Sequence, residues 1–532
     1  MLYGQGTDFD PERGCLPQTR VKIIDEIIGW VNDPSSPQVL LLFGQAGTGK
    51  SSIAHEIARR FRSLDRLTTS YRFVRGEPSS HDCYRFFTTL ARNLCKKYPA
   101  FRIALSTAIT NNPDLVEMRA YSTLFESLLR EPLKDICFVG PVLIVVDALD
   151  ESEDASETRW CDTPVFYDFF AKHAGELPSN FRLLITSRPE VDLLDAFPES
   201  SSVRHMHMSD QSSEEVDNDI LTYIRAKLSG TRVGKGDLLK LVKKAEGLFQ
   251  WAAVACNYIT RPPYGLNSEL CIQRVLNPPA NIKTGLNRLD QIYTTVLGRF
   301  DMDDPAVRDN FQSTMRQIIG SFEPLSIDAL NTMRTTCPTN NLGDISDIVK
   351  GLGSLLSNVT PSESALPVAP LHTSFRDFLV DGTRSGVFCV NLDNVHGEFA
   401  MSTLRTMQKE LRFNICELGT SYLLNREVLD LEQRIKNNIS SALSYSCHFW
   451  AVHLAHVSEF DQDLLKYIKM LMEENFLYWL EVMSLSGTLA LVSRGLVALR
   501  RWLGQMQDDV SISRVYFPNA ALTTKTDSER GG

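Results

Sequence analysis

The stretch Val39-Leu40-Leu41-Leu42-Phe43-Gly44-Gln45-Ala46-Gly47-Thr48-Gly49-Lys50-Ser51 joins a short apolar run to a glycine-rich loop. The loop fits the pattern G-x-x-x-x-G-K-[ST], which is typical of phosphate-binding loops between a buried strand and a helix. Residues 52–58 provide the beginning of such a helix. Glycine permits backbone angles at which the loop N–H groups turn toward a polyphosphate, at the positive end of the helix. The stretch therefore predicts a strand, a phosphate loop and a helix in succession.

The motif also assigns roles to individual side chains. We expect Lys50 to neutralise the β- and γ-phosphates of a nucleotide, and the hydroxyl of Ser51 to ligate Mg²⁺. The alternative is a glycine-rich turn with a solvated lysine, but a chance match in a chain of this length has odds on the order of 1 in 100. The residues predicted to bind nucleotide in this stretch are Gly44, Gln45, Ala46, Gly47, Thr48, Gly49, Lys50, Ser51 and Ser52.

Length and composition are those of an ordinary globular protein of several domains. The chain has 532 residues, of which 43% are hydrophobic and 23% charged, and such a length suggests roughly three or four domains. The net charge of -10 argues against a general affinity for nucleic acid, whose backbone would repel it. The 11 cysteines are scattered without a C-x-x-C pair, which favours reduced thiols over a disulfide framework or a zinc site.

No targeting or membrane-spanning segment is expected. Residues 1–10 contain neither a basic start nor an apolar core, so they do not fit a secretory signal. No apolar run approaches the ~20 residues that a helix needs to cross a bilayer. The sequence thus predicts a cytoplasmic protein.

Further strands recur along the first 210 residues and alternate with helical patterns. The segments expected to be strands are Thr68–Val74, Pro141–Asp147, Phe181–Thr186 and Val203–Met208. The unbroken apolar character of the second suits a parallel strand that is covered on both faces. The alternation predicts a doubly wound parallel sheet, an α/β P-loop NTPase core, with ligands at the carboxyl ends of the strands. Beyond residue 210 the pattern is helical.

Polar residues at two other strand ends supply the remaining chemistry. Asp147 ends an apolar strand and can hold the Mg²⁺ shell through water, and Asp150 and Glu151 follow one turn later. They are placed to orient or deprotonate a water that attacks the γ-phosphate, although each can also be a solvated loop acid. Arg188 follows the strand at 181–186 and can report the γ-phosphate through bidentate contacts. Its alternative is a surface arginine before a proline turn.

In Gly44–Ser51, Asp147–Glu151 and Thr186–Pro189, the sequence resembles the NACHT subgroup of signal-transduction (STAND) ATPases, which contains the NOD-like receptors. Two later stretches, Gly247–Ala253 and Pro370–Leu379, look like those of fungal NACHT proteins. The resemblance implies an ATPase core, a small helical domain, a winged-helix domain and a second helical domain. In many relatives a winged-helix histidine touches the β-phosphate of ADP. His372 is the matching residue here, with a purely structural histidine as the alternative.

The resemblance further implies a switch that ADP holds closed and that ATP opens for homo-oligomerisation, in fungal self/non-self recognition or cell death. Slow ATP hydrolysis would reset it. The alternatives are a turnover kinase or NTPase and a non-hydrolysing scaffold that keeps ADP; the trigger and the protein partners are not identified by the sequence. The expected divisions are a lead-in helix at 1–37, a nucleotide-binding domain at 38–211, a helical domain at 212–300, a winged-helix-like domain at 301–385, a second helical domain at 386–515 and a disordered tail at 516–532.

Overall fold

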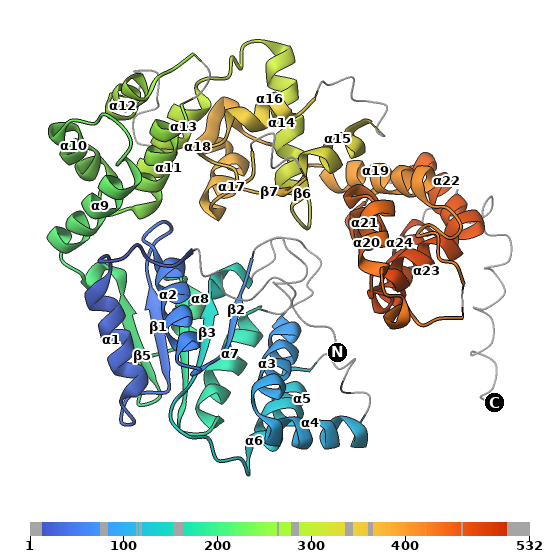
Figure 1. The fold of residues 1–532 in the computed structure, drawn as a ribbon, viewed down its shortest axis with the longest axis horizontal. Coiled ribbons are helices and arrows are strands. Elements are labelled where there is room, and N and C mark those ends of the chain that lie inside the picture. Colours follow the sequence, from blue (N-terminus) through green and yellow to red (C-terminus); the bar gives the residue numbers. More distant parts are fainter. Residues whose placement is uncertain are drawn as a thin grey trace, which may run out of the picture. The chain divides into compact units, whose positions relative to one another are not determined.

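The computed structural model describes residues 13–74, 83–112, 115, 120–152, 163–262, 265–277, 287–335, 344–359, 365–420, 422–458 and 461–507. They divide into two compact units (Figure 1). The first contains the chain up to Arg299 together with two later segments, His372–Phe378 and Thr383–Ser385. The second contains the rest. The six predicted divisions are finer than these units and stay a prediction, and the expected tail at 516–532 lies outside the described residues.

A parallel sheet forms the centre of the first unit. In the described residues it has five strands in the order β2-β3-β4-β1-β5, and every neighbouring pair is parallel. Because the strands are parallel, the loops that follow β1, β3 and β4 all leave the sheet at its carboxyl edge. The strands are β1 (Val39–Phe43), β2 (Leu67–Arg72), β3 (Val142–Asp147), β4 (Phe181–Ser187) and β5 (Val203–His207).

Helices cover both faces of this sheet (Figure 1). Leu40 and Leu42 of β1 pack with α1 (Val21–Asn32) and α2 (Lys50–Ser63). The alternate side chains, such as that of Leu41, pack with helices on the other face. Burial on both sides explains the continuous apolar runs of the strands, since each buried aliphatic side chain contributes about 2 kcal/mol. The predicted doubly wound α/β core is therefore confirmed. The helices of the other face are α3 (Cys83–Lys97), α5 (Tyr121–Phe125), α7 (Thr163–His173) and α8 (Val191–Ala196).

The rest of the first unit is helical. Helix α4 (Pro99–Asn111) was not predicted from the sequence, and α5 is followed by a π-helical turn at Glu126–Arg130 and a short α6 at Glu131–Leu133. Side-chain caps begin three of this unit's described helices after the sheet: Ser212 accepts a hydrogen bond from the Glu215 N–H, Asn267 from that of Leu270 and Asn287 from that of Asp290. The helices that follow the sheet in the first unit are α9 (Ser213–Lys227), α10 (Lys235–Ala245), α11 (Phe249–Thr260), α12 (Ser268–Leu276) and α13 (Arg288–Leu297).

The second unit begins with three helices and a two-stranded antiparallel sheet, and its later described elements are helices. The sheet pairs β6 (Leu325–Ser326) with β7 (Pro367–Val368). Trp450, Trp479 and Trp502 lie in the core of the later helices. A winged helix is not established by these elements and stays a prediction. The helices are α14 (Pro305–Gly320), α15 (Ile327–Thr335), α16 (Ser346–Gly351), α19 (Val395–Glu410), α20 (Leu431–Asn438), α21 (Ser441–Leu454), α22 (Gln462–Met470), α23 (Phe476–Leu485) and α24 (Ala490–Gln507).

Helix α17 (Thr373–Val380) belongs to the first unit through Phe378, although it follows β7 in the chain. This assignment matters because the residues of α17 carry part of the site described below. The short α18 (Gly382–Ser385) follows it.

Two expectations from composition can be compared with the structure. Cys83 is disulfide-bonded, so the expectation of reduced thiols is wrong at this position, whereas Cys15, Cys95 and Cys137 are free. Among the helices of the described residues, none combines the length and the hydropathy that a bilayer crossing requires.

Candidate functional site

The predicted phosphate loop is a tightly curved connection between β1 and α2. The Gly44 N–H donates to the carbonyl of Ser187 over 3.3 Å, and the Thr48 hydroxyl donates to the carbonyl of Gln45 over 2.8 Å. Gly47 and Gly49 have φ angles of +82° and +99°, values that side chains with a Cβ resist. The glycine spacing of the motif is therefore required by the path of the loop.

Lys50, the first residue of α2, turns back over this loop. Its ammonium group donates to the carbonyls of Gly44 at 2.5 Å and Gln45 at 3.1 Å. Burial lowers the pKa of Lys50, and the carboxylate of Asp150 opposes that shift. Ser51 and Ser52 are half-buried in the first turn of the same helix, where backbone N–H groups have no intrahelical partner. The residues predicted to surround a polyphosphate thus lie together.

Asp147 lies at the carboxyl end of β3, beside the loop. Its Oδ1 accepts from the Thr186 hydroxyl over 2.5 Å, and that hydroxyl accepts from the Ala148 N–H over 3.0 Å. Its Oδ2 is 4.0 Å from Nε of Arg72 and has no hydrogen-bond partner in the part of the chain that the structure describes. Ala148 has a φ of 58°, a left-handed conformation that a small residue tolerates better than a bulky one.

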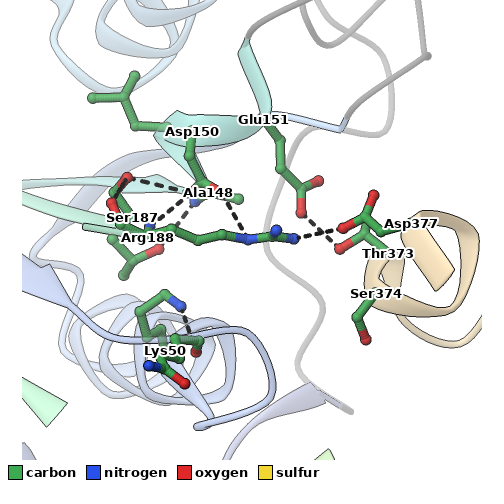
Figure 2. A network of polar contacts seen from close by, with 12 residues as sticks. Lys50, Ala148, Asp150, Glu151, Ser187, Arg188, Thr373, Ser374 and Asp377 are labelled. Atoms are coloured by element: carbon green, nitrogen blue, oxygen red, sulfur yellow. Dashed lines mark hydrogen bonds and ion pairs between the residues drawn. The ribbon is translucent and has the colours of Figure 1, made fainter. Parts of the chain in front are cut away.

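Asp150 and Arg188 form an ion pair at the ends of β3 and β4. Nε of Arg188 lies 3.2 Å from Oδ2 of Asp150, and the backbone N–H of Arg188 donates to Oδ1 over 3.0 Å. On its other side, Nη2 of Arg188 donates to Oδ2 of Asp377 on α17 over 3.1 Å. Figure 2 shows the guanidinium between the two carboxylates. Asp150 is 4% exposed, so the solvated loop acid is wrong for this residue. The side chain of Arg188 is 23% exposed and is ion-paired on both sides.

Glu151 is the second acid that α17 reaches. Its Oε1 accepts from the Thr373 hydroxyl over 2.9 Å, the contact that Figure 2 draws at the end of the Glu151 side chain. Glu151 is 8% exposed. Burial, and then the charge of Asp150, raise the pKa of Glu151 to about 7, while Arg72, Thr373 and Arg188 act in the opposite direction. A carboxyl group with a pKa near neutrality suits general acid–base chemistry.

His372 immediately precedes α17. Its Nδ1 accepts from the Ser374 N–H over 3.1 Å and lies 2.7 Å from the Ser374 hydroxyl. Burial, and then the positive charges of Arg188 and Lys50, lower the pKa of His372 to about 4. The ring is therefore neutral at physiological pH and carries its proton on Nε2. The Ser374 hydroxyl is also 2.7 Å from that of Tyr293 on α13, which fixes the segment from a third element.

A cavity of about 160 Å³ adjoins these groups. Its walls come from the phosphate loop, the end of β4, the helices after the sheet and α17. The residues that line it are Gln45, Ala46, Arg188, Leu248, Asn287, Leu289, Ser374, Asp377 and Arg384.

Thr373 and Asp377 were not predicted from the sequence, although they lie in the stretch Pro370–Leu379 that resembles fungal NACHT proteins. These two residues are four apart on α17, and residues at this spacing share one face of a helix. Helical spacing of polar residues behind His372 was therefore the signal that could have found them. Thr186 was quoted only as part of a motif, and its bond to Asp147 has no sequence signature.

The residues fit Mg²⁺ in the manner of phosphate-loop proteins. Within the described residues, no group of three or more His, Cys, Asp or Glu side chains could hold a metal. Mg²⁺ commonly binds through one or two protein oxygens, with phosphates and water completing the octahedron. Oδ2 of Asp147, which accepts no hydrogen bond from the described residues, and the hydroxyl of Ser51 are suitable oxygens of that kind.

Together, the sheet, the loop motif and the helices after them define an α/β P-loop NTPase core followed by a helical region. The family model described as "Nephrocystin 3, N-terminal" matches residues 23–188, a range that includes the phosphate loop and both acidic positions after β3. Among curated proteins, no sequence matches the chain significantly.

Two solved structures resemble the chain at low identity. One is a Signal Transduction ATPase with Numerous Domains (STAND) protein with a tetratricopeptide repeat sensor from Pyrococcus horikoshii. The two sequences are 12% identical. The match covers 95% of this chain and 66% of the other chain, with a TM-score of 0.39. The other is C. elegans PCH-2, 13% identical over 50% of this chain and 70% of its own, with a TM-score of 0.26. The resemblance to NACHT proteins stays a prediction.

Proposed function

We propose that this chain is an ATP- and ADP-binding switch ATPase, in which the γ-phosphate controls the attachment of α17 to the nucleotide site. The observation that supports it is the position of Arg188. This guanidinium lies at the carboxyl end of β4 and is bound at 3.1 Å by Asp377, which is 189 residues away in sequence.

The proposed mechanism is a competition for Arg188. A γ-phosphate presents anionic oxygens that bind a guanidinium in the same bidentate manner as a carboxylate. ADP has no such group, so Arg188 keeps Asp377 and α17 stays attached. ATP offers Arg188 a more highly charged partner, and Asp377 is released with its helix. The bound nucleotide thereby determines whether α17 is attached to the site.

The acidic residues after β3 and Mg²⁺ act in ATP hydrolysis, the step that returns the switch to its ADP state. Mg²⁺, held by Ser51 and through water by Asp147, would supply charge neutralisation on the phosphates. Asp150 keeps Arg188 in place through its two contacts. Glu151, with a pKa of about 7, accepts the proton of the attacking water once its contact with Thr373 is lost. Hydrolysis is accordingly slow while α17 holds Glu151.

His372 would stabilise the ADP state. Its neutral ring carries a proton on Nε2, a donor suited to a β-phosphate oxygen. In keeping with the resemblance to NACHT proteins, we place the switch in the cytoplasm and assign it a winged-helix domain after the first helical domain. Release of α17 then permits homo-oligomerisation, and fungal immunity-like or cell-death signalling is the process that this resemblance implies.

The test is the substitution Asp377→Asn, with dissociation constants for ADP and for a non-hydrolysable ATP analogue measured by calorimetry. The variant should bind the ATP analogue roughly tenfold more tightly, since a charged hydrogen bond of about 1.5–3 kcal/mol no longer competes for Arg188. The affinity for ADP should change by less than about twofold. Light scattering with the ATP analogue should detect larger particles for the variant than for the wild type.

Asp168→Asn provides a matched control, because Asp168 is an exposed carboxylate on α7 of the same unit. An equal change in both affinities, or none, would refute competition at Arg188. A wild-type protein that binds no nucleotide would refute the whole proposal. Fast turnover in the wild type would favour a kinase or other turnover enzyme, and ADP retained without hydrolysis would favour a scaffold.

A further inference from the structure

Arg20 is a buried arginine just ahead of α1, outside the set of residues that the sequence analysis assigned to the site. It is 3% exposed and has a left-handed backbone conformation with a φ of 57°. Burial lowers the pKa of Arg20, while the carboxylate of Asp219 opposes that shift. A buried guanidinium is costly to desolvate unless its N–H groups find partners. The identity of those partners is therefore informative.

The partners of Arg20 join the phosphate loop to the helices after the sheet. Nη2 donates to the carbonyl of Thr48 in the loop over 2.7 Å. Nη1 donates to Gln211, just ahead of α9, and the backbone N–H donates to Oδ2 of Asp219 within α9 over 3.0 Å. The guanidinium carbon lies 4.5 Å from the centre of the Phe249 ring, at the first residue of α11. The guanidinium thus contacts the loop, the segment ahead of α9 and the first residue of α11, and the backbone of Arg20 adds the bond to α9.

Helix α11 meets the same loop at a second point. The N–H of Gln250 donates to the carbonyl of Gly47 over 3.0 Å. A Cβ added at Gly47 would lie 2.8 Å from Cβ of Gln250, so the loop and the helix are in close contact. Two successive residues of α11 therefore contact the loop, one directly and one through Arg20. The carbonyl groups of Gly47 and Thr48 lie next to the N–H groups of the loop that would face a phosphate.

We propose that Arg20 is a positioning residue that links the phosphate loop to α9 and α11, so that a nucleotide bound in the loop also stabilises these helices. The inference rests on the proposed nucleotide binding but not on the competition at Arg188. Arg20 makes no contact with the nucleotide in this proposal. It holds the Thr48 carbonyl turned outward, and the following N–H groups consequently stay turned toward the phosphates.

The test compares Arg20→Met, Arg20→Lys and Lys22→Ala. Methionine keeps most of the apolar stem and removes every guanidinium bond, whereas lysine can restore the single bond to Thr48. Lys22→Ala is the matched control, because Lys22 pairs with Glu215 across the same junction of α1 and α9 without contacting the loop. ADP affinity is measured by calorimetry, and amide hydrogen exchange in α9 and α11 is measured by mass spectrometry with and without ADP.

Arg20→Met should weaken ADP binding roughly tenfold, as expected for loss of a charged hydrogen bond, and should reduce the ADP-dependent protection of α9 and α11. Arg20→Lys should recover at least part of the affinity, and Lys22→Ala should match the wild type in both readouts. Should Arg20→Met fail to fold, Phe249→Leu removes one contact of the guanidinium without exposing a buried charge and should reduce the protection of α11.

Affinity within about twofold of the wild type in Arg20→Met, with protection of α9 and α11 retained, would overturn the inference while leaving nucleotide binding intact. Protection retained in a folded Phe249→Leu variant would also count against it. Absence of ADP binding by the wild type would instead remove the proposed function on which it rests.

Discussion

Replacement of Glu151 by glutamine should stabilise the sheet of the first unit above neutral pH. The wild-type carboxyl group is buried, and burial followed by the charge of Asp150 raises its pKa from 4.5 to about 7. That difference corresponds to roughly 3 kcal/mol of preference for the protonated form. A neutral amide occupies nearly the same space and avoids this cost, at the loss of part of the bond from Thr373.

The direction of the pH dependence follows from the two pKa values. Between pH 4.5 and about 7 the folded protein holds the proton on Glu151 and the unfolded chain has released it. The free energy of unfolding therefore falls as the pH rises through this window. The contribution of Glu151 is fully present below the unfolded value and is lost above the folded one. Glu151→Gln removes this dependence, so the gap between variant and wild type should widen by about 2 kcal/mol from pH 5.5 to 8.5.

Hydrogen exchange of the slowest amides in β3 and β4, corrected for intrinsic rates at each pH, measures this gap without interference from the second unit. Glu190→Gln, at an exposed carboxylate in the same unit, should show no comparable widening. Thr373→Val removes a hydrogen bond that lowers the pKa of Glu151, and it should shift the inflection to higher pH. A gap that stays constant from pH 5.5 to 8.5 would refute the raised pKa and with it the proton-accepting role of Glu151.

Three further outcomes are expected. Lys50→Ala should weaken ATP and ADP binding at least roughly hundredfold in calorimetry, as loss of the charge facing two phosphates implies; unchanged affinity would contradict the phosphate-loop assignment. Gly47→Ala should lower the melting temperature, since φ is +82° and the new Cβ would lie 2.8 Å from that of Gln250, and strain of about 1–3 kcal/mol is expected; Gly487→Ala, at φ +68° with open space around it, should cost less. His372→Ala should speed ADP release in stopped-flow measurements and favour oligomers in light scattering, whereas unaltered release from a monomer would make the histidine structural.

The sheet could be predicted because the residues that define each strand and the phosphate loop are adjacent in the sequence. Strands β1 and β3 are buried on both faces, so their sequences are apolar without interruption, and the loop motif fixes which strand comes first. The missed helix α4 shows the limit of this reasoning. Of its residues only Phe101 and Leu105 are buried, and two apolar contacts leave no periodic pattern for a sequence to display.

The site could be predicted where it depends on the parallel sheet and not where it depends on α17. Parallel strands place Lys50, Asp147 and Arg188 at one edge, whatever the loops between them contain. The contacts of Thr373 with Glu151 and of Asp377 with Arg188 span 222 and 189 residues. No local pattern specifies which distant helix closes over that edge, because the choice depends on the packing of every element between them.

The charges of the site indicate which part of it moves in the proposed response to a nucleotide. Asp147, Asp150 and Glu151 lie within five residues at the end of β3. The raised pKa of Glu151, to which burial and then the charge of Asp150 contribute, is one response, since a retained proton removes one negative charge. A triphosphate adds several more, which Mg²⁺ offsets only in part. Asp147 and Asp150 are held by Thr186 and by the backbone of Arg188, and they cannot leave without breaking the ends of β3 and β4. Asp377 binds this edge through the guanidinium of Arg188 and belongs to α17, not to the sheet, so in the proposed switch it is the carboxylate that a γ-phosphate displaces.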